Sequence, residues 1–185
     1  MSFFTKYEIW EYVKLIAISL AIILPIRMYI AQPFIVSGSS MDPTFFNGDY
    51  LVIDEISYQF DAPKRGEVIV FRYPLDTSKF FIKRVVGLPH ETVSINGGVV
   101  TITNNEQPAG FVLQENYVNG VTLPDAFKKL GEKEYYVMGD NRAFSADSRY
   151  WGTLNEEYII GRALVRLWPI ENLGLWPGLL NTVTQ

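Results

Sequence analysis

Hydrophobic residues form one continuous run near the N-terminus and only short runs later in the chain. Between Leu15 and Ile26 the chain carries no charge, and its apolar character continues with few interruptions to Ile35. At a helical rise of about 1.5 Å per residue, these positions would cover roughly 31 Å, close to the thickness of a bilayer's hydrocarbon core. The pattern predicts a single N-terminal transmembrane helix within an anchor segment, residues 1–33, with Pro25 kinking or ending the helix.

Two other interpretations compete with a retained anchor. A cleaved secretory signal needs a basic start and small residues before the cut, whereas Glu8 and Glu11 dilute the start and Tyr29 is bulky. A buried core helix would also fit the short uninterrupted run. The aromatic residues Trp10 and Tyr12 favour the anchor, because such residues are common at membrane interfaces. The positive charges weakly favour a cytoplasmic N-terminus, which would place the rest of the chain on the extracytoplasmic side of a cell membrane in a single pass.

After Pro33 the helical period gives way to short β-branched and aromatic runs between turn residues. Asn96-Gly97-Gly98 between two of these runs is typical of a hairpin, and helical patterns between the runs are missing. We therefore expect a mainly β domain of antiparallel sheet over residues 34–185, in which residues 104–131 form loops or a small insertion. The expected strands are Tyr50–Ile53, Val68–Tyr73, Phe80–Val86, Thr92–Ile95, Val99–Ile102, Tyr135–Met138 and Ile159–Trp168.

Composition narrows the possible chemistry. The chain of 185 residues has a formal net charge of −4 and a pI near 5.1, so nothing favours nucleic acid as a partner. It has no cysteine, which excludes disulfides, thiolate nucleophiles and zinc-thiolate sites. His90 is the single histidine, so a Ser-His-Asp set would have to use it and no multi-histidine metal site can form. The remaining catalytic options are carboxylates, lysine and tyrosine.

Ser40 is a candidate nucleophile within the run SGSSMDPT, residues 37–44. Pro43 disfavours a helical conformation at Asp42, so we expect the chain to pass Ser40 extended and then to turn. The small neighbours Gly38 and Ser39 leave backbone N–H groups open to an approaching carbonyl, as an oxyanion site requires. Serine-glycine runs are more often plain loops, so this run needs a partner before it indicates catalysis.

Lys83 is the candidate partner. In the expected strand Phe80–Val86 it shares a face with Phe81 and Val85, because side chains alternate along a strand. Burial disfavours the charged ammonium, and lowering the pKa from near 10.4 to about 8 would need roughly 3 kcal/mol. A neutral amine could then accept the proton of a serine hydroxyl as it attacks a carbonyl. The plain alternative is a strand-edge lysine with its head in water.

A third candidate element runs from Gly139 to Gly152 and is dense in turn formers and paired charges. We expect its charged residues to form structural ion pairs that brace a long loop and fix its geometry. Two hydroxyls in it, those of Ser145 and Ser148, are candidates for orienting Lys83. The charged residues are Asp140, Arg142, Asp147 and Arg149.

Together, four ordered motifs resemble the sequence boxes of type I signal peptidases. They are SGSSMDPT, then RGEVIVF from Arg65, IKRVVGLP from Ile82, and GDNR with SADSRYWG from Gly139. The resemblance extends from Gln32 to about Pro169. It implies an antiparallel β-sheet catalytic domain held on the membrane. It also implies endoproteolytic removal of signal peptides from exported preproteins by a Ser-Lys dyad through an acyl-enzyme, without metal or cofactor.

Carried over by position, the resemblance makes Ser40 the nucleophile and Lys83 the general base. The backbone N–H of Ser40 would serve the oxyanion hole, Ser145 would orient the lysine, and Asp147 and Arg149 would form a structural ion pair. Some members have a serine as a second oxyanion donor where this chain has Gly38. This chain also has Ala143 and Phe144 where the family usually has Asp-Asn.

Substrate selection follows from the same resemblance. Signal-peptide cleavage sites carry small side chains at the first and third positions before the cut, which shallow apolar pockets would select by excluding bulk. The peptide would add as a strand beside Ile35–Gly38 and Phe80–Lys83. The expected partners are therefore signal-peptide-bearing preproteins and the lipid bilayer. The residues implied to line the pockets, for which ordinary core packing is an equal alternative, are Val36, Met41, Phe45 and Ile82.

Two other functions fit parts of the sequence. Self-cleaving repressors share the dyad chemistry, but they carry a DNA-binding region where this chain has an apolar run. A catalytically silent, membrane-anchored β module that only binds preproteins or partner proteins would keep the fold without needing both Ser40 and Lys83.

Overall fold

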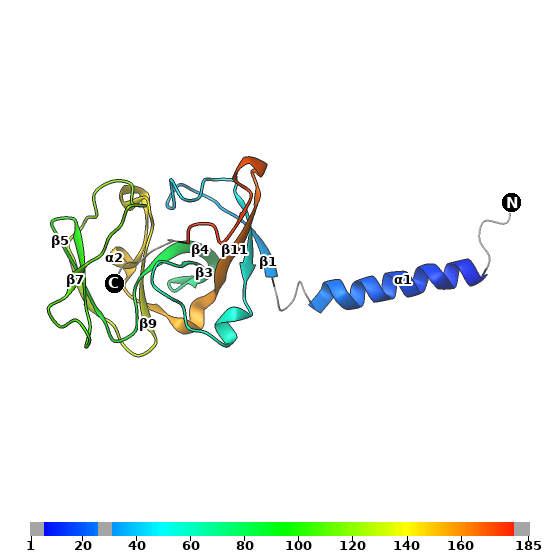
Figure 1. The fold of residues 1–185 in the computed structure, drawn as a ribbon, viewed down its shortest axis with the longest axis horizontal. Coiled ribbons are helices and arrows are strands. Elements are labelled where there is room, and N and C mark those ends of the chain that lie inside the picture. The colour runs from blue at the N-terminus through cyan, green and yellow to red at the C-terminus, as the bar shows by residue number, and fades with distance from the viewer. Residues whose placement is uncertain (1–5, 26–30, 180–185) are drawn as a thin grey trace.

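The computed structural model describes residues 6–25 and 31–179 of the chain, and Figure 1 shows their arrangement. The segment Lys6–Pro25 forms helix α1, and the residues directly after Pro25, where the helix was expected to kink or end, lie outside the described residues. The expected transmembrane helix is not found within the described residues, because no helix among them is both long enough and apolar enough to cross a membrane.

The apolar run does not continue as a helix to Ile35. Instead, Ala31–Ile35 forms strand β1, which pairs antiparallel with strand β2, Tyr50–Asp54. The helical length expected for the whole run is therefore wrong. Pro33 has no N–H group to donate within a helix, and the other residues of β1 form ladder hydrogen bonds with β2. The sheet thus takes in residues 31–33, which the sequence pattern placed with the N-terminal segment.

Two sheets account for the remaining architecture of the described residues, and the strand pairs within them are antiparallel, which confirms a mainly β fold. The large sheet has the strand order β1-β2-β11-β3-β4-β9-β10, and β12 pairs with β11. The small sheet has the order β7-β6-β5-β8 and lies beside the large one in Figure 1. The strands of the large sheet not yet bounded are β3 (Val68–Tyr73), β4 (Asp76–Gly87), β9 (Glu134–Met138), β10 (Leu154–Asn155), β11 (Ile159–Trp168) and β12 (Gly174–Leu175).

The small sheet takes in part of the segment expected to be loops or an insertion. Its hairpin of β5 (Thr92–Asn96) and β6 (Val99–Thr103) is the one that the Asn-Gly-Gly turn predicted. Its outer strands, β7 (Phe111–Val112) and β8 (Ala126–Lys129), come from residues 104–131. The helical turns elsewhere are α2 (Ser148–Trp151), η2 (Ser57–Gln59), η3 (Arg142–Phe144), η4 (Glu156–Tyr158) and η5 (Ile170–Asn172).

Strand β3 lies between two clusters of buried side chains and explains how the large sheet holds the site. Val68 and Val70 pack on one face, in a cluster that includes Met41 and Phe45. Ile69 and its neighbour Phe71 pack on the other face. Because β3 is buried on both faces, it reads as a continuous apolar run, and it gives the neighbouring strand β4 a rigid support.

Candidate active site

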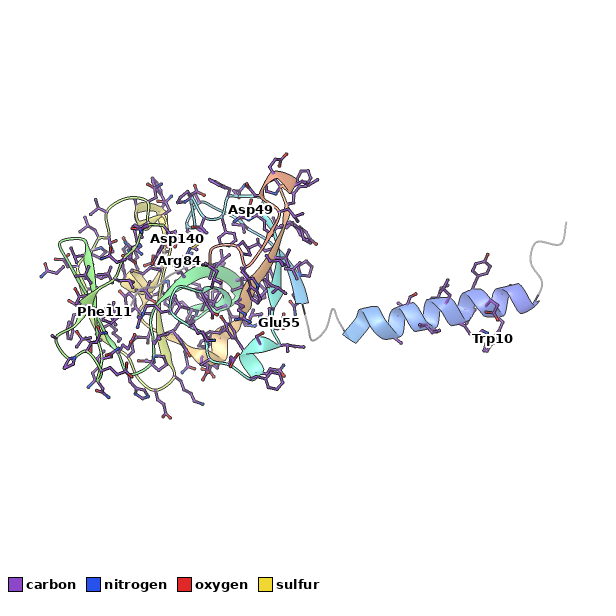
Figure 2. The ribbon with its side chains drawn as sticks, in the orientation of Figure 1. Trp10, Asp49, Glu55, Arg84, Phe111 and Asp140 are labelled. Carbon is purple, nitrogen blue, oxygen red and sulfur yellow. The ribbon has the colours of Figure 1, made fainter. Side chains whose placement is uncertain are left out.

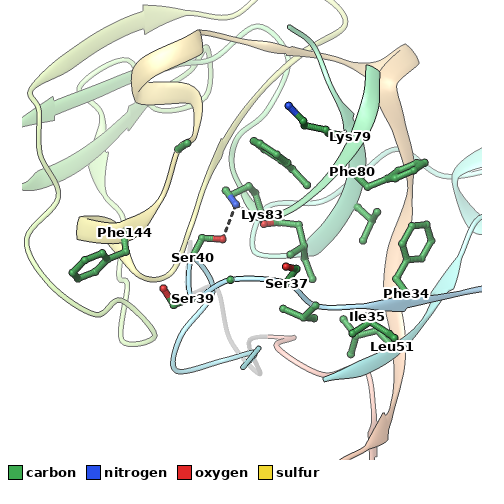
Figure 3. A pocket seen from close by; sticks show the side chains of 16 residues that line it. Phe34, Ile35, Ser37, Ser39, Ser40, Leu51, Lys79, Phe80, Lys83 and Phe144 are labelled. Carbon is green, nitrogen blue, oxygen red and sulfur yellow. Dashed lines mark hydrogen bonds between the residues drawn. The ribbon is translucent and has the colours of Figure 1, made fainter. Parts of the chain in front are cut away.

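Ser40 and Lys83 meet at the centre of the site although they are far apart in the chain. The Nζ atom of Lys83 lies 2.8 Å from the Oγ atom of Ser40 (Figure 3). Ser40 comes from the turn that follows β1, and Lys83 comes from the middle of β4. At this distance a neutral amine can accept the hydroxyl proton directly.

The surroundings of Lys83 shield its amine from solvent. The residue is 4% exposed, and Nζ lies 5.3 Å from the centre of the Phe81 ring, in line with the expectation that both side chains share one strand face. Burial is the main cause that lowers the pKa of Lys83 from 10.5 to about 8, while the charges of Asp147 and Asp140 act in the opposite direction. Nζ also donates to the carbonyl of Ile82 at 2.8 Å, which holds it toward Ser40.

The turn that carries Ser40 is held from behind by Asn141. The backbone N–H of Asn141 donates to the Ser40 carbonyl at 3.1 Å, and its side-chain amide donates to the Ser39 carbonyl at 3.0 Å. Ser40 already belongs to the turn, so the expected extended conformation at this residue is wrong. The reason is a hydrogen bond of 3.2 Å from the N–H of Asp42 to the carbonyl of Ser39, which closes a turn around Ser40 and Met41. A second bond, from the N–H of Phe45 to the carbonyl of Met41, continues the curl after Ser40.

The charged residues of the 139–149 loop are paired, but two of them pair outside the loop. Asp147 and Arg149 bind each other at 2.8 Å, as expected, and both side chains are buried. Asp140 instead binds Arg84 at 2.6 Å, and Figure 2 shows these two side by side. Arg142 binds Glu115 at 2.5 Å.

The sequence analysis missed both outside partners. Arg84 had a signal, because strand alternation places it on the same face of β4 as the apolar residues Ile82 and Val86. Glu115 had none, since it lies in a segment without a clear pattern and reaches Arg142 only through the tertiary fold.

A cavity of about 600 Å³ opens beside the Ser40–Lys83 pair. Val36 and Ile82 line it, as the resemblance implied. Met41 and Phe45 do not line it, because they are 1% and 0% exposed and belong to the core beneath. Phe80 and Phe81 also line it, and they belong to the segment expected beside the substrate. The sequence analysis missed other apolar residues of the wall, namely Phe34, Leu51 and Val70.

The comparisons with known proteins agree with this geometry. Residues 9–168 match the family model described as signal peptidase, peptidase S26. The chain is 41% identical over 175 residues to signal peptidase I of Leptolyngbya laminosa, an alignment that covers 89% of this chain and 82% of the relative. The chain belongs to the type I signal peptidase family. It is accordingly a serine peptidase, and the resemblance of its four motifs is confirmed.

A second relative is similar over most of the chain. The chain is 37% identical over 172 residues to probable signal peptidase I-2 of Synechocystis, which covers 88% of this chain and 74% of the relative. A crystal structure of a signal peptidase I from Enterococcus faecalis aligns with 55% of this chain and 97% of that chain, at 28% identity and a TM-score of 0.48.

Ser145 does not make the hydrogen bond to Lys83 that the family resemblance implied. Its Oγ atom is buried and has no hydrogen-bond partner among the described residues. The Nζ atom of Lys83 is instead bound to Ser40 and to the Ile82 carbonyl. Ser148 does not reach the lysine either, because its Oγ accepts a hydrogen bond from the N–H of Val137 at 3.0 Å.

Gly139 allows the 139–149 loop to lie directly against the nucleophile turn. A Cβ atom at this position would lie 2.6 Å from the Cβ of Ser145 and would overlap the Oγ of Ser145 and the carbonyl oxygen of Ser40. The Ser145 Cβ and the Ser40 backbone are not at the ends of flexible side chains. A new Cβ atom at position 139 could therefore be accommodated only by a shift of the loop or of the nucleophile turn, which costs free energy.

Gly139→Ala is therefore expected to lower the free energy of unfolding by about 1–3 kcal/mol and to move Ser40 away from Lys83. Urea denaturation and the rate of substrate cleavage measure the two effects. The matched control is Gly174→Ala, whose new Cβ would only make an ordinary contact of 3.9 Å with the Asn172 carbonyl. Equal behaviour of the two variants would contradict the close approach at Gly139.

No group of three or more His, Asp or Glu side chains that could hold a metal ion occurs in the part of the chain that the structure describes. His90 lines a second cavity together with Arg65 and Glu91, and neither Ser40 nor Lys83 borders that cavity. The described site therefore offers serine and lysine as its reactive groups.

Proposed function

We propose that this protein removes signal peptides from exported preproteins with Ser40 as nucleophile and Lys83 as general base. Membership of the signal peptidase family makes it a signal-peptide-removing protease, and the dyad is the finer assignment. The observation that carries the dyad is the 2.8 Å contact between Nζ and Oγ in surroundings that lower the pKa of the lysine to about 8.

The reaction follows from these two groups. Lys83 accepts the hydroxyl proton while the Ser40 Oγ attacks the scissile carbonyl, and the protonated lysine then returns the proton to the amine of the leaving chain. The acyl-enzyme that remains is hydrolysed by a water molecule, with Lys83 again as the base.

The oxyanion site has one backbone donor ready. The N–H of Ser40 has no acceptor among the described residues, so it is free to donate to the developing oxyanion. The second donor used by some family members is missing here, since Gly38 has no hydroxyl. Gly38 adopts a φ of +94°, and its N–H is bound to the side chain of Asn47 at 3.0 Å. We therefore assign the Ser40 N–H as the oxyanion donor.

The cavity suits the small side chains found before a signal-peptide cut. The segments Ile35–Gly38 and Phe80–Lys83 form two of its walls, and a peptide laid between them would present alternate side chains to the apolar lining. The substrate partner is therefore a preprotein bound as an extended strand.

The bilayer is proposed as the second partner, with the catalytic domain on the extracytoplasmic face of the cell membrane and the N-terminal segment as a single-pass anchor. Exposed apolar side chains occur along α1, where Trp10 and Leu15 are 59% and 62% exposed. Others lie near the end of the chain, where Trp168 and Leu175 are 57% and 70% exposed. Such groups are favourable at a lipid interface.

A serine-directed acylating probe tests the proposal against a catalytically silent binding module. Folded protein should be labelled at Ser40 and should cleave a signal-bearing preprotein in detergent, and Ser40→Ala should abolish both. A protein that binds the preprotein without labelling or cleavage would support the silent module.

The cleavage rate is expected to rise with pH up to about 8 and to level off above it. Below its pKa the lysine carries a proton and cannot accept another, so each decrease of one pH unit should lower the rate about tenfold. Steady-state cleavage of a synthetic signal peptide between pH 6 and 10 measures this. A rate that stays flat down to about pH 5 contradicts a lysine base.

A further inference from the structure

Phe144 is an exposed aromatic residue at the edge of the active-site cavity. It lines the cavity together with Ser39, Ser40 and Ala146, and it is 74% exposed. Its ring makes no aromatic or cation–π contact with a described residue. An aromatic side chain left in water at this place contributes little to the core, so its position needs another explanation.

The backbone of Phe144 is fixed although its side chain is exposed. Two nearby residues of the same loop, Arg142 at 1% and Ser145 at 5% exposed, are buried. Its N–H donates to the carbonyl of Asn141 at 3.2 Å, and Asn141 in turn binds the carbonyls of Ser39 and Ser40. The backbone of Phe144 is therefore held at a defined place relative to the nucleophile, and its ring extends from that place.

Phe144 also lies on a particular side of the nucleophile. In Figure 3 it lies across Ser40 from Phe34, Ile35 and Leu51, which belong to the apolar wall of the cavity. The residues before the scissile bond occupy that apolar wall in the proposed function. A strand that runs through the cavity and presents its carbonyl to Ser40 must then continue past Phe144.

We propose that Phe144 contacts the first two residues of the leaving chain and favours apolar side chains there. The inference rests on the proposed function, because it uses the direction of the bound substrate. Small exposed neighbours, Ala143 and Ala146, leave the ring's sides open to a substrate side chain. Phe144 is thus a specificity-determining residue for the part of the preprotein that is released as the mature protein.

Two peptides that differ only after the cut test this assignment. Both carry the same signal sequence with alanine at the first and third positions before the cut, and the next two residues are Leu-Leu in one and Ser-Ser in the other. Phe144→Ala is expected to lower the ratio of kcat/KM for the leucine peptide over the serine peptide by about tenfold, the lower end of what one apolar contact contributes to specificity. Phe144→Leu should keep most of the ratio.

The matched control is Phe127→Ala, which removes an equally exposed phenylalanine, 76% exposed, from strand β8 of the small sheet. It should leave the ratio unchanged. An unchanged ratio in Phe144→Ala overturns the assignment. So does an equal loss of kcat/KM for both peptides, because that would indicate a general effect on the loop.

Binding separates this inference from the proposed function. In a Ser40→Ala background, fluorescence anisotropy of the two labelled, uncut peptides should show the same dependence on Phe144→Ala, as a drop in the ratio of their affinities. If the affinity ratio drops but the protein with Ser40 in place cleaves neither peptide, the proposed dyad is contradicted and the role of Phe144 is supported. If both peptides are cleaved but Phe144→Ala changes neither the kcat/KM ratio nor the affinity ratio, the dyad is supported and the role of Phe144 is contradicted.

Discussion

Replacing Lys83 by methionine is expected to reduce the rate of signal-peptide cleavage by about 10³- to 10⁴-fold, because no other described group lies where it could take the proton of Ser40. Methionine fills a similar volume without a basic atom. Single-turnover cleavage of a signal-bearing substrate in detergent measures the loss. His90→Ala is the control and should leave the rate unchanged, since His90 borders a different cavity.

The same substitution is expected to stabilise the fold. At pH 7 the amine is mostly protonated in both states, but in the folded protein the charge is buried, as the pKa lowered from 10.5 to about 8 indicates. This difference corresponds to a cost on the order of 3 kcal/mol, which Lys83→Met removes. In the wild type the cost is relieved between pH 8 and 10.5, where the unfolded chain binds more protons than the folded one, so stability should rise over that range.

Urea denaturation of wild type and Lys83→Met at pH 7 and pH 10 measures this effect. The gain in stability should be large at pH 7 and small at pH 10. A variant that loses stability at pH 7 would show that the amine is a charged, paired group in the fold, and the dyad would then lack its base.

Asp140→Ala is expected to lower the free energy of unfolding by about 3–5 kcal/mol, because it leaves the buried charge of Arg84 without its partner. The two side chains are 1% and 0% exposed, and two hydrogen bonds of 2.8 and 2.6 Å join the guanidinium to the carboxylate. Thr44 also loses the acceptor of its hydroxyl, at 2.5 Å. Cleavage should fall as well, since Asp140 precedes the Asn141 that holds the Ser40 turn.

Two further variants make this result specific. Asp76→Ala removes an ion pair of similar length, 2.8 Å to Lys79, but this pair lies in solvent and its loss should change stability little. The double variant Arg84→Met with Asp140→Leu should recover part of the stability lost in Asp140→Ala, because no unpaired charge is left inside. A double variant less stable than Asp140→Ala would contradict the unpaired charge as the cause.

Local sequence rules worked where the deciding contacts lie within one strand or turn. The alternation of Phe80–Val86 correctly placed Phe81 and Lys83 on one face, and the Asn-Gly-Gly turn correctly predicted the β5–β6 hairpin. These features depend on neighbours a few residues away, and the chain supplies those neighbours directly.

Expectations from the family resemblance and from the loop pattern were less accurate where distant segments compete for a side chain. For Met41 and Phe45 the resemblance left the substrate pocket and the core as equal alternatives, and the core is correct because the chain curls after Ser40. Ser145 was assigned to Lys83, but the lysine's hydrogen bonds go elsewhere. Glu115 became the partner of Arg142 from a segment that carried no readable pattern.

The amino-acid order was enough to establish the antiparallel β class and the family and to single out Ser40 and Lys83 as the proposed dyad, because periodicity and ordered motifs are local and are read along the chain. Only the assembled sheets decided three features of the site. They are the burial of the Lys83 amine away from water, the partners of the buried charges and the place of Phe144 beside the nucleophile. Each of these depends on which remote surfaces exclude water from a given atom, and that exclusion exists only once the chain is folded.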